Sequence, residues 1–569
     1  MKKAFLILLL FLIVTFVFMH PVILNMKTRI AGFYSTDEPY GVIWSFWWAK
    51  FAHLTKRPTG LIDILASPFG IQTISIPFFP LWAFMAKYIS IFFNEIAAYN
   101  LLLLLTFVFS AGTMYWLMFY LTRDRGVSIF SALIYSFCPF HFVRVWQHFG
   151  TAQIQWMPLV ILLLIKLRED KKVKTALYLG LSLALNHYFD THYVYFMFIV
   201  TGLFLVLELF SRDSLRDKFI ITLLFSFAIF ISLSIILPSL APFLKKIAQS
   251  KGQPLSAYTL ERPFEDLFGQ SARPLSYLLP FTEHPVFGSL TNMFVGTNLW
   301  GESLTEHNLF LGFIPLALTV IAIRQRKSLV SFMKRRGREI SLTLKFFIFL
   351  VAVAWLFSQP PWWSIFKFKL YMPSFFMYKI LPVFRAYVRF GIVVMLGVSV
   401  LAGLGLQLAL KRFKTPMSKA VIVFLVCSFS LYEFWSNPKE HVIDLSKTPR
   451  VYDWLKEQRG DFTISEYPLD IKGVNEVYKF YQTKHQKKII NATLPGTDAN
   501  MIARGLTKLS SPRTQAMLKW MAVKYILVHL DDYKNSGLVE DMEELKNIHN
   551  TNGLKLSHTL ENIEVYQLR

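Results

Sequence analysis

The chain has 569 residues, of which 54% are hydrophobic, 16% aromatic and 17% charged, and its net charge is +24. Soluble domains carry about 25% charged residues, and this chain holds many apolar runs of the roughly 20 residues that cross a bilayer. The composition therefore excludes a soluble globular protein and predicts a polytopic α-helical membrane protein. The positive charge does not indicate nucleic acid as a partner, because most basic residues lie in short loops between spans, where they set orientation. Cys138 and Cys427 lie in or beside apolar segments and indicate no disulfide framework.

The N-terminal segment begins with Lys2 and Lys3, followed by an uncharged run from Ala4 to Asn25. A basic start and an apolar core also describe a signal peptide, but no small-residue cleavage site follows, and the run is long enough to span. We expect a retained first helix with a cytoplasmic N-terminus. A long extracytoplasmic loop, residues 26–75, should come next.

Two adjacent carboxylates, Asp37 and Glu38, lie in that loop. Trp44, Trp47 and Trp48 follow at i, i+3 and i+4, so they share one face of a helix. Indole rings are stable at a membrane–water boundary. We therefore expect a helix along the interface that holds the carboxylates at headgroup level, where chemistry on a lipid-borne substrate would take place. The alternative is that the charged pair only terminates a membrane helix.

The segment 76–93 contains two prolines and a lysine, and it decides the topology. If it does not cross the membrane, five successive basic loops, near 123–125, 168–174, 212–218, 324–338 and 411–419, all fall on the side of the N-terminus. That pattern obeys the positive-inside rule, whereas a crossing segment would place every one of these loops outside. The sequence thus predicts about eleven transmembrane helices. After the first helix they lie near 95–121, 127–140, 152–167, 175–188, 192–210, 219–239, 309–323, 343–358, 386–409 and 420–435.

Two domains are expected. Residues 1–435 form the transmembrane domain, and in residues 436–569 the apolar runs shorten and charges interleave, which is typical of a domain outside the membrane. There the pattern predicts a small extracytoplasmic α/β domain. Its expected elements are helices at 451–458 and 515–520 and strands at 461–467, 524–529 and 563–568.

Three outer loops carry further candidate residues. Asp190 and His192 lie between two short spans, where ionisable groups are functional candidates, although Asp190 could equally cap the helix that starts at Thr191. His148 and Gln153 lie in the preceding outer loop. The loop at 242–308, with Glu302 and Glu306, is expected to be solvated. The groups that could together hold a divalent cation are Asp37, Glu38, His148, Asp190 and His192, although they lack a metal-ligand spacing.

The outer segment 359–390 is basic and contains no acidic residue. Its cations are Lys367, Lys369, Lys379, Arg385 and Arg389. Arg385 and Arg389 are four residues apart and so share a helical face. A guanidinium binds phosphate in bidentate fashion, so the cluster predicts a phosphate site. The alternative is general contact with anionic headgroups.

A carboxylate and a phosphate-binding cluster on one side of a membrane suggest transfer of a sugar from a polyprenyl phosphate. A phosphate needs little protonation to leave, so cations can replace the general acid that a glycosidase requires. One carboxylate then serves as general base on the acceptor hydroxyl. We assign that role to Asp37, with Glu38 second, and the donor phosphate to Arg385 and Arg389 with Lys369 and Lys367.

These residues resemble the GT-C superfamily of integral-membrane glycosyltransferases, in which an acidic residue lies in a long first extracytoplasmic loop. Protein O-mannosyltransferases have an Asp-Glu pair there, which Asp37-Glu38 resembles. More closely, the chain is similar to a group of prokaryotic GT-C-like membrane proteins, which implies a location in a prokaryotic plasma membrane. The motifs that carry this resemblance are Asp37…Trp44, Trp47; Tyr99-Asn100; His148, Gln153, Trp156, Pro158, Leu159; Leu381-Pro382-Val383-Phe384-Arg385 with Arg389-Phe390; and Val451-Tyr452-Asp453-Trp454-Leu455 with Glu466-Tyr467-Pro468-Leu469.

The resulting hypothesis is an inverting GT-C-type glycosyltransferase that acts on an extracytoplasmic glycan, lipid or protein. One alternative is a non-catalytic GT-C-like scaffold for envelope assembly. Another is a transporter or lipid flippase, but transporters place ionisable groups near the membrane midplane. Here the spans are almost free of charge and the charged residues cluster in outer loops, which favours the transferase.

Overall fold

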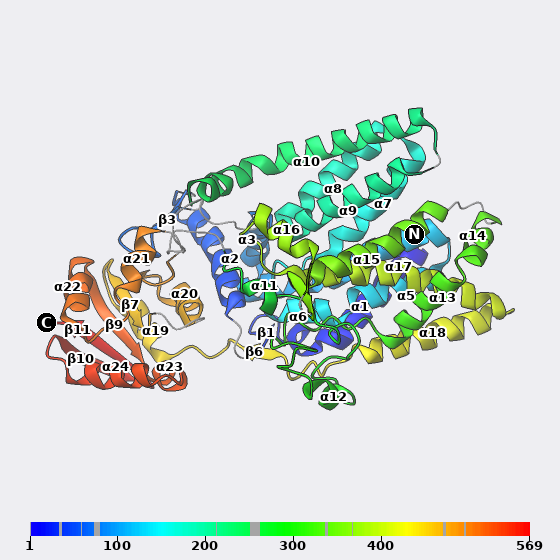
Figure 1. Cartoon of the computed structure of the whole chain (residues 1–569). Coiled ribbons are helices and arrows are strands. Elements are labelled where there is room, and N and C mark those ends of the chain that lie inside the picture. Colours follow the sequence, from blue (N-terminus) through cyan, green and yellow to red (C-terminus); the bar gives the residue numbers. More distant parts are fainter. Residues whose placement is uncertain are drawn as a thin grey trace. The chain divides into compact units, whose positions relative to one another are not determined.

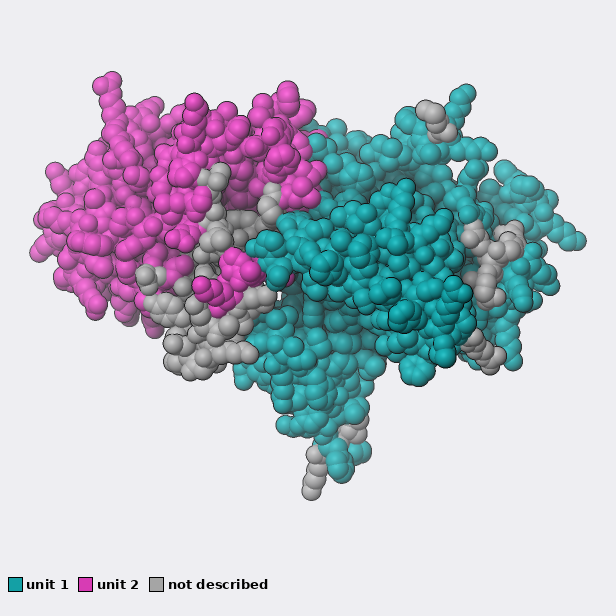
Figure 2. All heavy atoms as spheres, turned by 90° about the horizontal axis from the view of Figure 1, so that it is seen from above, with its two compact units in different colours: residues 1–24, 101–238, 261–441 teal, residues 25–100, 239–260, 442–569 magenta. Residues whose placement is uncertain are grey.

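The computed structural model describes residues 2–33, 37–58, 60–72, 80–211, 213–250, 262–335, 340–366, 368–469, 474–493 and 497–569. The chain forms two compact units, coloured separately in Figure 2. The first unit contains residues 1–24, 101–238 and 261–441. The second contains residues 25–100, 239–260 and 442–569. The predicted boundary between a transmembrane domain and an extracytoplasmic domain after residue 435 is a different kind of division, and it stays a prediction.

The first unit is almost entirely helical (Figure 1). Two short strands, β4 (Trp362–Ile365) and β5 (Phe368–Tyr371), pair as an antiparallel hairpin. Two helices, α4 (Glu95–Thr122) and α10 (Leu215–Ser250), contribute residues to both units. The other helices are α1 (Lys2–Ile23), α5 (Arg125–Ser136), α6 (Pro139–Gln147), α7 (Met157–Asp170), α8 (Val173–Phe189), α9 (Thr191–Leu209), α11 (Asp266–Gly269), α12 (Gly288–Asn292), α13 (Phe313–Arg324), α14 (Arg326–Arg335), α15 (Ser341–Ser358), α16 (Pro373–Ile380), α17 (Gly391–Ala409) and α18 (Pro416–Glu433).

The polytopic helical architecture is confirmed. Among the described residues, seven helices are long and apolar enough to cross a membrane, or up to eight if the bent pair α5 and α6 forms one span. The count of eleven is not confirmed, because three segments predicted as spans form the shorter helices α7, α8 and α13, of 14, 17 and 12 residues. Segment 76–93, expected not to cross, contains the 13-residue helix α3 (Pro80–Phe92), and residues 76–79 lie outside the described residues.

Helix α17 forms the centre of the first unit. Every residue from Gly391 to Leu408 is buried, and the helix packs against α5, α13 and α15. A helix that is apolar on all sides is stable only when it is covered on all sides. Gly405 permits the closest approach, because a Cβ there would lie 2.0 Å from the carbonyl oxygen of Leu318 on α13. This helix supplies the fixed frame for the residues that precede it.

The second unit contains a five-stranded sheet in the order β10-β11-β9-β7-β8, with β7 parallel to β8 and β9. The helices and strands predicted for residues 451–568 are confirmed as α19, β7, α22, β9 and β11. The strands are β7 (Thr463–Tyr467), β8 (Lys488–Ile489), β9 (Val523–His529), β10 (Leu554–Leu560) and β11 (Ile563–Leu568). The helices are α19 (Arg450–Glu457), α20 (Val474–His485), α21 (Asp498–Arg504), α22 (Pro512–Trp520), α23 (Leu530–Asn535) and α24 (Val539–Asn550).

The first loop is part of this second unit. Its strand β1 (Arg29–Ala31) pairs antiparallel with β6 (Val442–Asp444). Strands β2 (Leu61–Ile62) and β3 (Ile71–Gln72) pair with each other. Asn100 donates from Nδ2 to the carbonyl oxygens of Met26 (2.9 Å) and Arg29 (2.6 Å), which fixes the start of the loop.

The tryptophan helix α2 (Glu38–Leu54) is a core element of the second unit. Trp44, Trp47 and Trp48 are only 1%, 6% and 7% exposed, and they share a core with residues of α19, β7 and β9. Protein therefore covers the three rings, and the predicted position of the helix along the membrane interface stays a prediction. Helical spacing shows that one face is apolar, but it does not show whether lipid or protein covers that face.

The sheet separates two cores because side chains alternate along each strand. On β9, Tyr525 and Leu527 face the core that contains the tryptophans. Ile526 and Val528 face the opposite core, which α22 and α24 help to form. The first loop therefore completes one of the two faces of the C-terminal sheet.

Candidate functional site

A buried ion cluster in the first unit joins Arg144, Glu306 and Arg389. Arg144 donates through both terminal nitrogens to the two Glu306 carboxylate oxygens, with Nη1 3.0 Å from Oε1. Arg389 donates from Nη2 to Glu306 Oε1 at 2.8 Å. The three side chains are 0%, 4% and 13% exposed for Arg144, Glu306 and Arg389. Two cations thus share one carboxylate away from water.

The two neighbouring arginines determine the protonation state of Glu306. Burial alone would raise the pKa of this carboxyl, but Arg144 and Arg389 outweigh it and hold the pKa well below its usual range. Glu306 is therefore ionised at neutral pH. A backbone bond from Glu306 N to Ser303 Oγ at 3.1 Å holds the turn that presents the carboxylate.

Asp190 and His192 lie close to this cluster. Asp190 caps α9 by accepting from the His192 N–H at 2.7 Å, and its Oδ1 also lies 2.7 Å from His192 Nδ1. Burial would raise the pKa of Asp190, but His192 and Arg389 lower it below the ordinary value. Asp190 therefore caps α9, as the structural alternative predicted. The negative charge of Asp190 also helps to balance the positive charge of Arg389.

A second, more exposed cluster involves Arg385, Asp266 and Arg262. Arg385 donates from Nη1 to Asp266 Oδ2 at 2.5 Å, and these side chains are 41% and 29% exposed. The backbone N–H of Arg262 donates to the Pro382 carbonyl at 3.0 Å. Burial lowers the pKa of Arg262, Arg385 lowers it further, and Asp266 opposes both. Arg385 thus pairs with Asp266 at a partly exposed position, and the charges of Arg262 and Asp266 act on each other as well.

The expectation that the cations of 359–390 lack carboxylate partners is wrong for Arg385 and Arg389. Their partners, Asp266 and Glu306, come from the other outer loop, which sequence spacing could not connect to them. The loop at 242–308 is likewise not simply solvated, because Glu306 is buried, although Glu302 is exposed.

The lysines of the cluster have different surroundings. Lys369 Nζ lies 4.3 Å from the centroid of the Trp362 ring, and Lys379 Nζ lies 4.4 Å from that of Phe375. Lys367 lies outside the described residues. The lysines thus contact aromatic rings of the hairpin β4–β5 and of α16, whereas the two arginines contact carboxylates.

Asp37 and Glu38 belong to the second unit, at the start of α2. Asp37 occupies the N-cap position, yet its side chain makes no capping hydrogen bond, and it is half-buried. Glu38 is the first residue of α2 and interacts electrostatically with Tyr99. The pair therefore does not terminate a membrane helix. It begins helix α2 of the second unit, and the Asp37 carboxylate makes no capping hydrogen bond.

Gln153 has a structural role. It is fully buried, donates from Nε2 to the Phe149 carbonyl at 3.0 Å, and accepts from Gln155 at the same distance. His148 ends α6. Within the described ranges, no three or more His, Cys, Asp or Glu side chains are grouped so as to hold a metal ion. The candidates Asp37 and Glu38 lie in one unit, and His148, Asp190 and His192 in the other.

Four residues of these clusters were not singled out from sequence: Arg144, Arg262, Asp266 and Glu306 as an ion-pair partner. Arg144 carried a usable signal, because it is the only Lys, Arg, Asp or Glu in the apolar stretch 137–147. The other three lie in a long polar loop, where a charged residue is ordinary.

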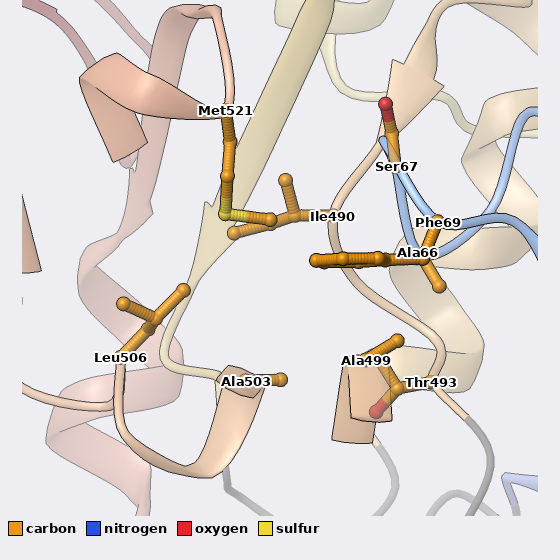
Figure 3. A pocket seen from close by; sticks show the side chains of 9 residues that line it. All are labelled: Ala66, Ser67, Phe69, Ile490, Thr493, Ala499, Ala503, Leu506 and Met521. Carbon is orange, nitrogen blue, oxygen red and sulfur yellow. The ribbon is translucent and has the colours of Figure 1, made fainter. Parts of the chain in front are cut away.

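A small apolar pocket lies in the second unit (Figure 3). None of the nine described residues that line it is charged, so it offers no cation to a phosphate. Its lining consists of Ala66, Ser67, Phe69, Ile490, Thr493, Ala499, Ala503, Leu506 and Met521. We therefore do not assign the donor to this pocket.

Comparison with solved structures identifies the class of fold. The chain is similar to the oligosaccharyltransferase AglB from Archaeoglobus fulgidus, in complex with an inhibitory peptide and a dolichol-phosphate, with TM-score 0.53, 10% identity and coverage of 100% of this chain and 74% of that one. It is also similar to the arabinofuranosyltransferase AftD from mycobacteria (TM-score 0.56, 13% identity, 100% and 40% coverage). ArnT from Cupriavidus metallidurans, bound to undecaprenyl phosphate, matches with TM-score 0.52, 10% identity and 99% and 98% coverage.

No protein-family model and no curated protein sequence matches the chain. The structural likeness is nevertheless continuous over the whole chain. The protein therefore has the GT-C fold of integral-membrane glycosyltransferases, as the sequence motifs predicted.

Proposed function

We propose that the protein is a GT-C-type glycosyltransferase that moves a sugar from a polyprenyl-phosphate donor to an extracytoplasmic acceptor. The observation that carries the proposal is the fold match to ArnT, which covers 99% of this chain and 98% of that one and whose structure contains undecaprenyl phosphate. We place the N-terminus in the cytoplasm and residues 436–569 outside it, as the positive-inside pattern predicts.

Asp37 is the proposed general base, with Glu38 second. It takes the proton of the acceptor hydroxyl while the acceptor oxygen bonds to the anomeric carbon. The bond from that carbon to the phosphate oxygen breaks with inversion, and the polyprenyl phosphate leaves with the electron pair. The absence of a capping hydrogen bond at Asp37 supports this role, because its carboxylate does not have to give up a helix contact to accept a proton.

For the donor phosphate we propose Arg385 first, with Arg389, Lys369 and Lys367. Arg385 is 41% exposed and its ion pair with Asp266 is only partly buried, so its guanidinium is accessible to a ligand. Arg389 is already held by Glu306, so we assign it mainly to positioning. Bidentate guanidinium contacts would stabilise the charge that develops on the leaving phosphate.

The test is to compare wild type with Asp37→Asn and Arg385→Gln in membranes and to analyse cellular glycans and glycolipids by mass spectrometry. We expect the same glycan to disappear in both variants and in the double variant. Glu543→Gln, which changes an exposed carboxylate of the same unit as Asp37, is the matched control and should leave the profile unchanged. If a folded Asp37→Asn protein gives the same glycan profile as wild type, Asp37 is not the catalytic base, and the scaffold or transporter hypothesis is favoured.

A further inference from the structure

The hairpin β4–β5 and the helix α16 expose large apolar side chains to an unusual degree. Phe366 is 99% exposed, Phe368 80% and Ile380 75%. Leu370 and Phe376 are more than half exposed as well. Soluble surfaces rarely collect so many large apolar groups within 15 residues, and such patches mark interaction sites. We call these five side chains the hairpin surface.

Phe366 at the hairpin tip also has a strained backbone. Its φ is +53°, in the left-handed region that bulky side chains rarely adopt. A glycine would suit that turn better, and a polar residue would suit water better. Strain of this kind is kept where surrounding structure or function requires it. An aromatic ring held fully exposed at a strained turn therefore points to a contact outside the protein.

Within the segment that carries the hairpin surface, all charged residues are basic, and its described carboxylate partner, Asp266, is paired with Arg385. The sequence from 359 to 386 contains no acidic residue. Lys369 and Lys379 each hold the ammonium nitrogen over an aromatic ring, so their charges lie directly beside the apolar side chains. Aromatic and aliphatic groups next to lysines are the composition that binds the headgroup region of anionic membranes.

The position of the hairpin in the chain agrees with this composition. It lies between α15, which ends at Ser358, and the apolar segment that begins at Tyr387, and both qualify as membrane spans. Its base is fixed, because Met372 N donates to the Pro361 carbonyl at 2.9 Å. The Trp363 ring packs edge-on against Trp355 of α15, with centroids 5.6 Å apart. The hairpin is thus anchored next to a span while its apolar tip has no cover within the described structure.

We propose that the hairpin surface inserts into the bilayer that surrounds the protein and that Lys369 and Lys379 bind the headgroups of anionic phospholipids there. The occupant is the acidic lipid membrane itself. This inference concerns how the outer segment 359–386 is held, and of the residues proposed for the donor phosphate it involves Lys369. Its tests measure the position of the hairpin and not sugar transfer, so it can fail separately from the proposed function.

The depth of the tip can be measured directly. Phe366→Cys is labelled with an environment-sensitive fluorophore in the full-length protein and reconstituted in vesicles of phosphatidylcholine and phosphatidylglycerol. The native Cys138 and Cys427 are buried, and labelled wild type gives the background. We expect quenching by lipids that carry spin labels on their acyl chains and little quenching by aqueous iodide.

The matched control is Val539→Cys, a site on α24 that is 74% exposed and lies in the extramembrane sheet unit. It should show the reverse pattern, with strong iodide quenching. If the label at residue 366 is quenched by iodide as strongly as the label at residue 539, the insertion proposal is overturned.

The charge part of the proposal has its own test. In vesicles of phosphatidylcholine alone, the label at residue 366 should be more accessible to iodide than in vesicles that also contain phosphatidylglycerol. The double change Lys369→Gln and Lys379→Gln should abolish that difference. If the label at residue 366 responds to phosphatidylglycerol equally with and without the two lysines, these lysines do not bind anionic headgroups.

Discussion

Trp44 donates its indole N–H to the side-chain oxygen of Gln482 at 2.9 Å, across 438 residues of sequence. Gln482 in turn donates to the carbonyl oxygens of Ile64 (2.7 Å) and Lys487 (2.9 Å). One buried amide therefore joins α2, the middle of the first loop and the segment that enters β8. The loop that carries the proposed base is thus fixed by the C-terminal domain.

Trp44→Ala should destabilise this second unit strongly. Large-to-small changes of a buried tryptophan cost about 3–5 kcal/mol, and the change also leaves Gln482 without its donor. We expect earlier cleavage of the unit in limited proteolysis of the detergent-solubilised protein. Trp520→Ala, at a 65% exposed ring of the same unit, is the control and should change little. Equal protease sensitivity of the two variants would contradict the shared core.

Glu306→Gln should destabilise the first unit. It leaves the Arg144 guanidinium fully buried without a counter-charge, and removal of one partner of a buried pair costs about 3–5 kcal/mol. Thermal unfolding in detergent is the measurement. Glu302→Gln, at an exposed position four residues earlier, should leave the unfolding temperature unchanged. A small change in unfolding temperature for both variants would show that the ion pairs of Glu306 contribute little to the stability of the first unit.

The same carboxylate predicts a pH dependence. The pKa of Glu306 is lower in the folded protein than its ordinary value of 4.5. Its contribution to stability is therefore complete above that ordinary pKa and is lost as pH falls through the lower, folded pKa. The stability difference between wild type and Glu306→Gln should be constant from neutral pH down to about 4.5 and shrink below it. Unfolding curves across that range test this, and a difference that shrinks already near pH 7 would be inconsistent with a depressed pKa.

Arg385 and Arg389 should behave differently when changed to Gln. Arg389 makes a buried, charge-assisted bond whose loss costs about 1.5–3 kcal/mol, so Arg389→Gln should lower the unfolding temperature. Arg385 is 41% exposed, and partly exposed pairs contribute about 0–1 kcal/mol. Arg385→Gln should therefore fold normally but bind a polyprenyl phosphate more weakly, as measured by ligand-induced thermal shift. If instead Arg385→Gln lowers the unfolding temperature and Arg389→Gln weakens polyprenyl-phosphate binding, then Arg389 binds the phosphate and Arg385 has the positioning role.

Tyr452→Phe should weaken the C-terminal sheet. The Tyr452 hydroxyl donates to the buried carboxylate of Glu466 at 2.7 Å, and burial followed by the Glu466 charge raises the pKa of this tyrosine well above its usual range, so it remains a donor. Loss of a donor to a buried acceptor costs about 1–3 kcal/mol. Tyr525→Phe is the control, because the described residues provide no hydrogen-bond partner for its hydroxyl. Denaturant unfolding of the full chain should separate the two variants.

The sequence predicted features that depend on local pattern. The spans α4, α9, α15 and α17 and the C-terminal elements follow from apolar runs and from periodicity, which neighbouring residues determine. The tryptophan face was found, but its surroundings were misjudged. The reason is that the residues that cover it, such as Val451 and Leu527, lie about 400 or more positions away in sequence.

The ion clusters were beyond the reach of local pattern for the same reason. Arg144 and Glu306 are 162 residues apart, and Arg385 and Asp266 are 119 residues apart. A charged residue in a loop belongs to no periodic pattern, so the sequence does not indicate which residue it pairs with. The motif around Arg385 was recognised as important, but the carboxylate that limits its free charge was not.

The pairing of β1 with β6 has a consequence for biosynthesis. Arg29 to Ala31 and Val442 to Asp444 form one ladder, so both strands must lie on the same side of the membrane. The chain must therefore cross the bilayer an even number of times between them. During translation, the three tryptophans of the first loop also stay uncovered until more than 400 further residues have been made. A ribosome that stalls before residue 442 would release a protein with an exposed apolar face, which is the kind of surface that chaperones and quality-control proteases bind.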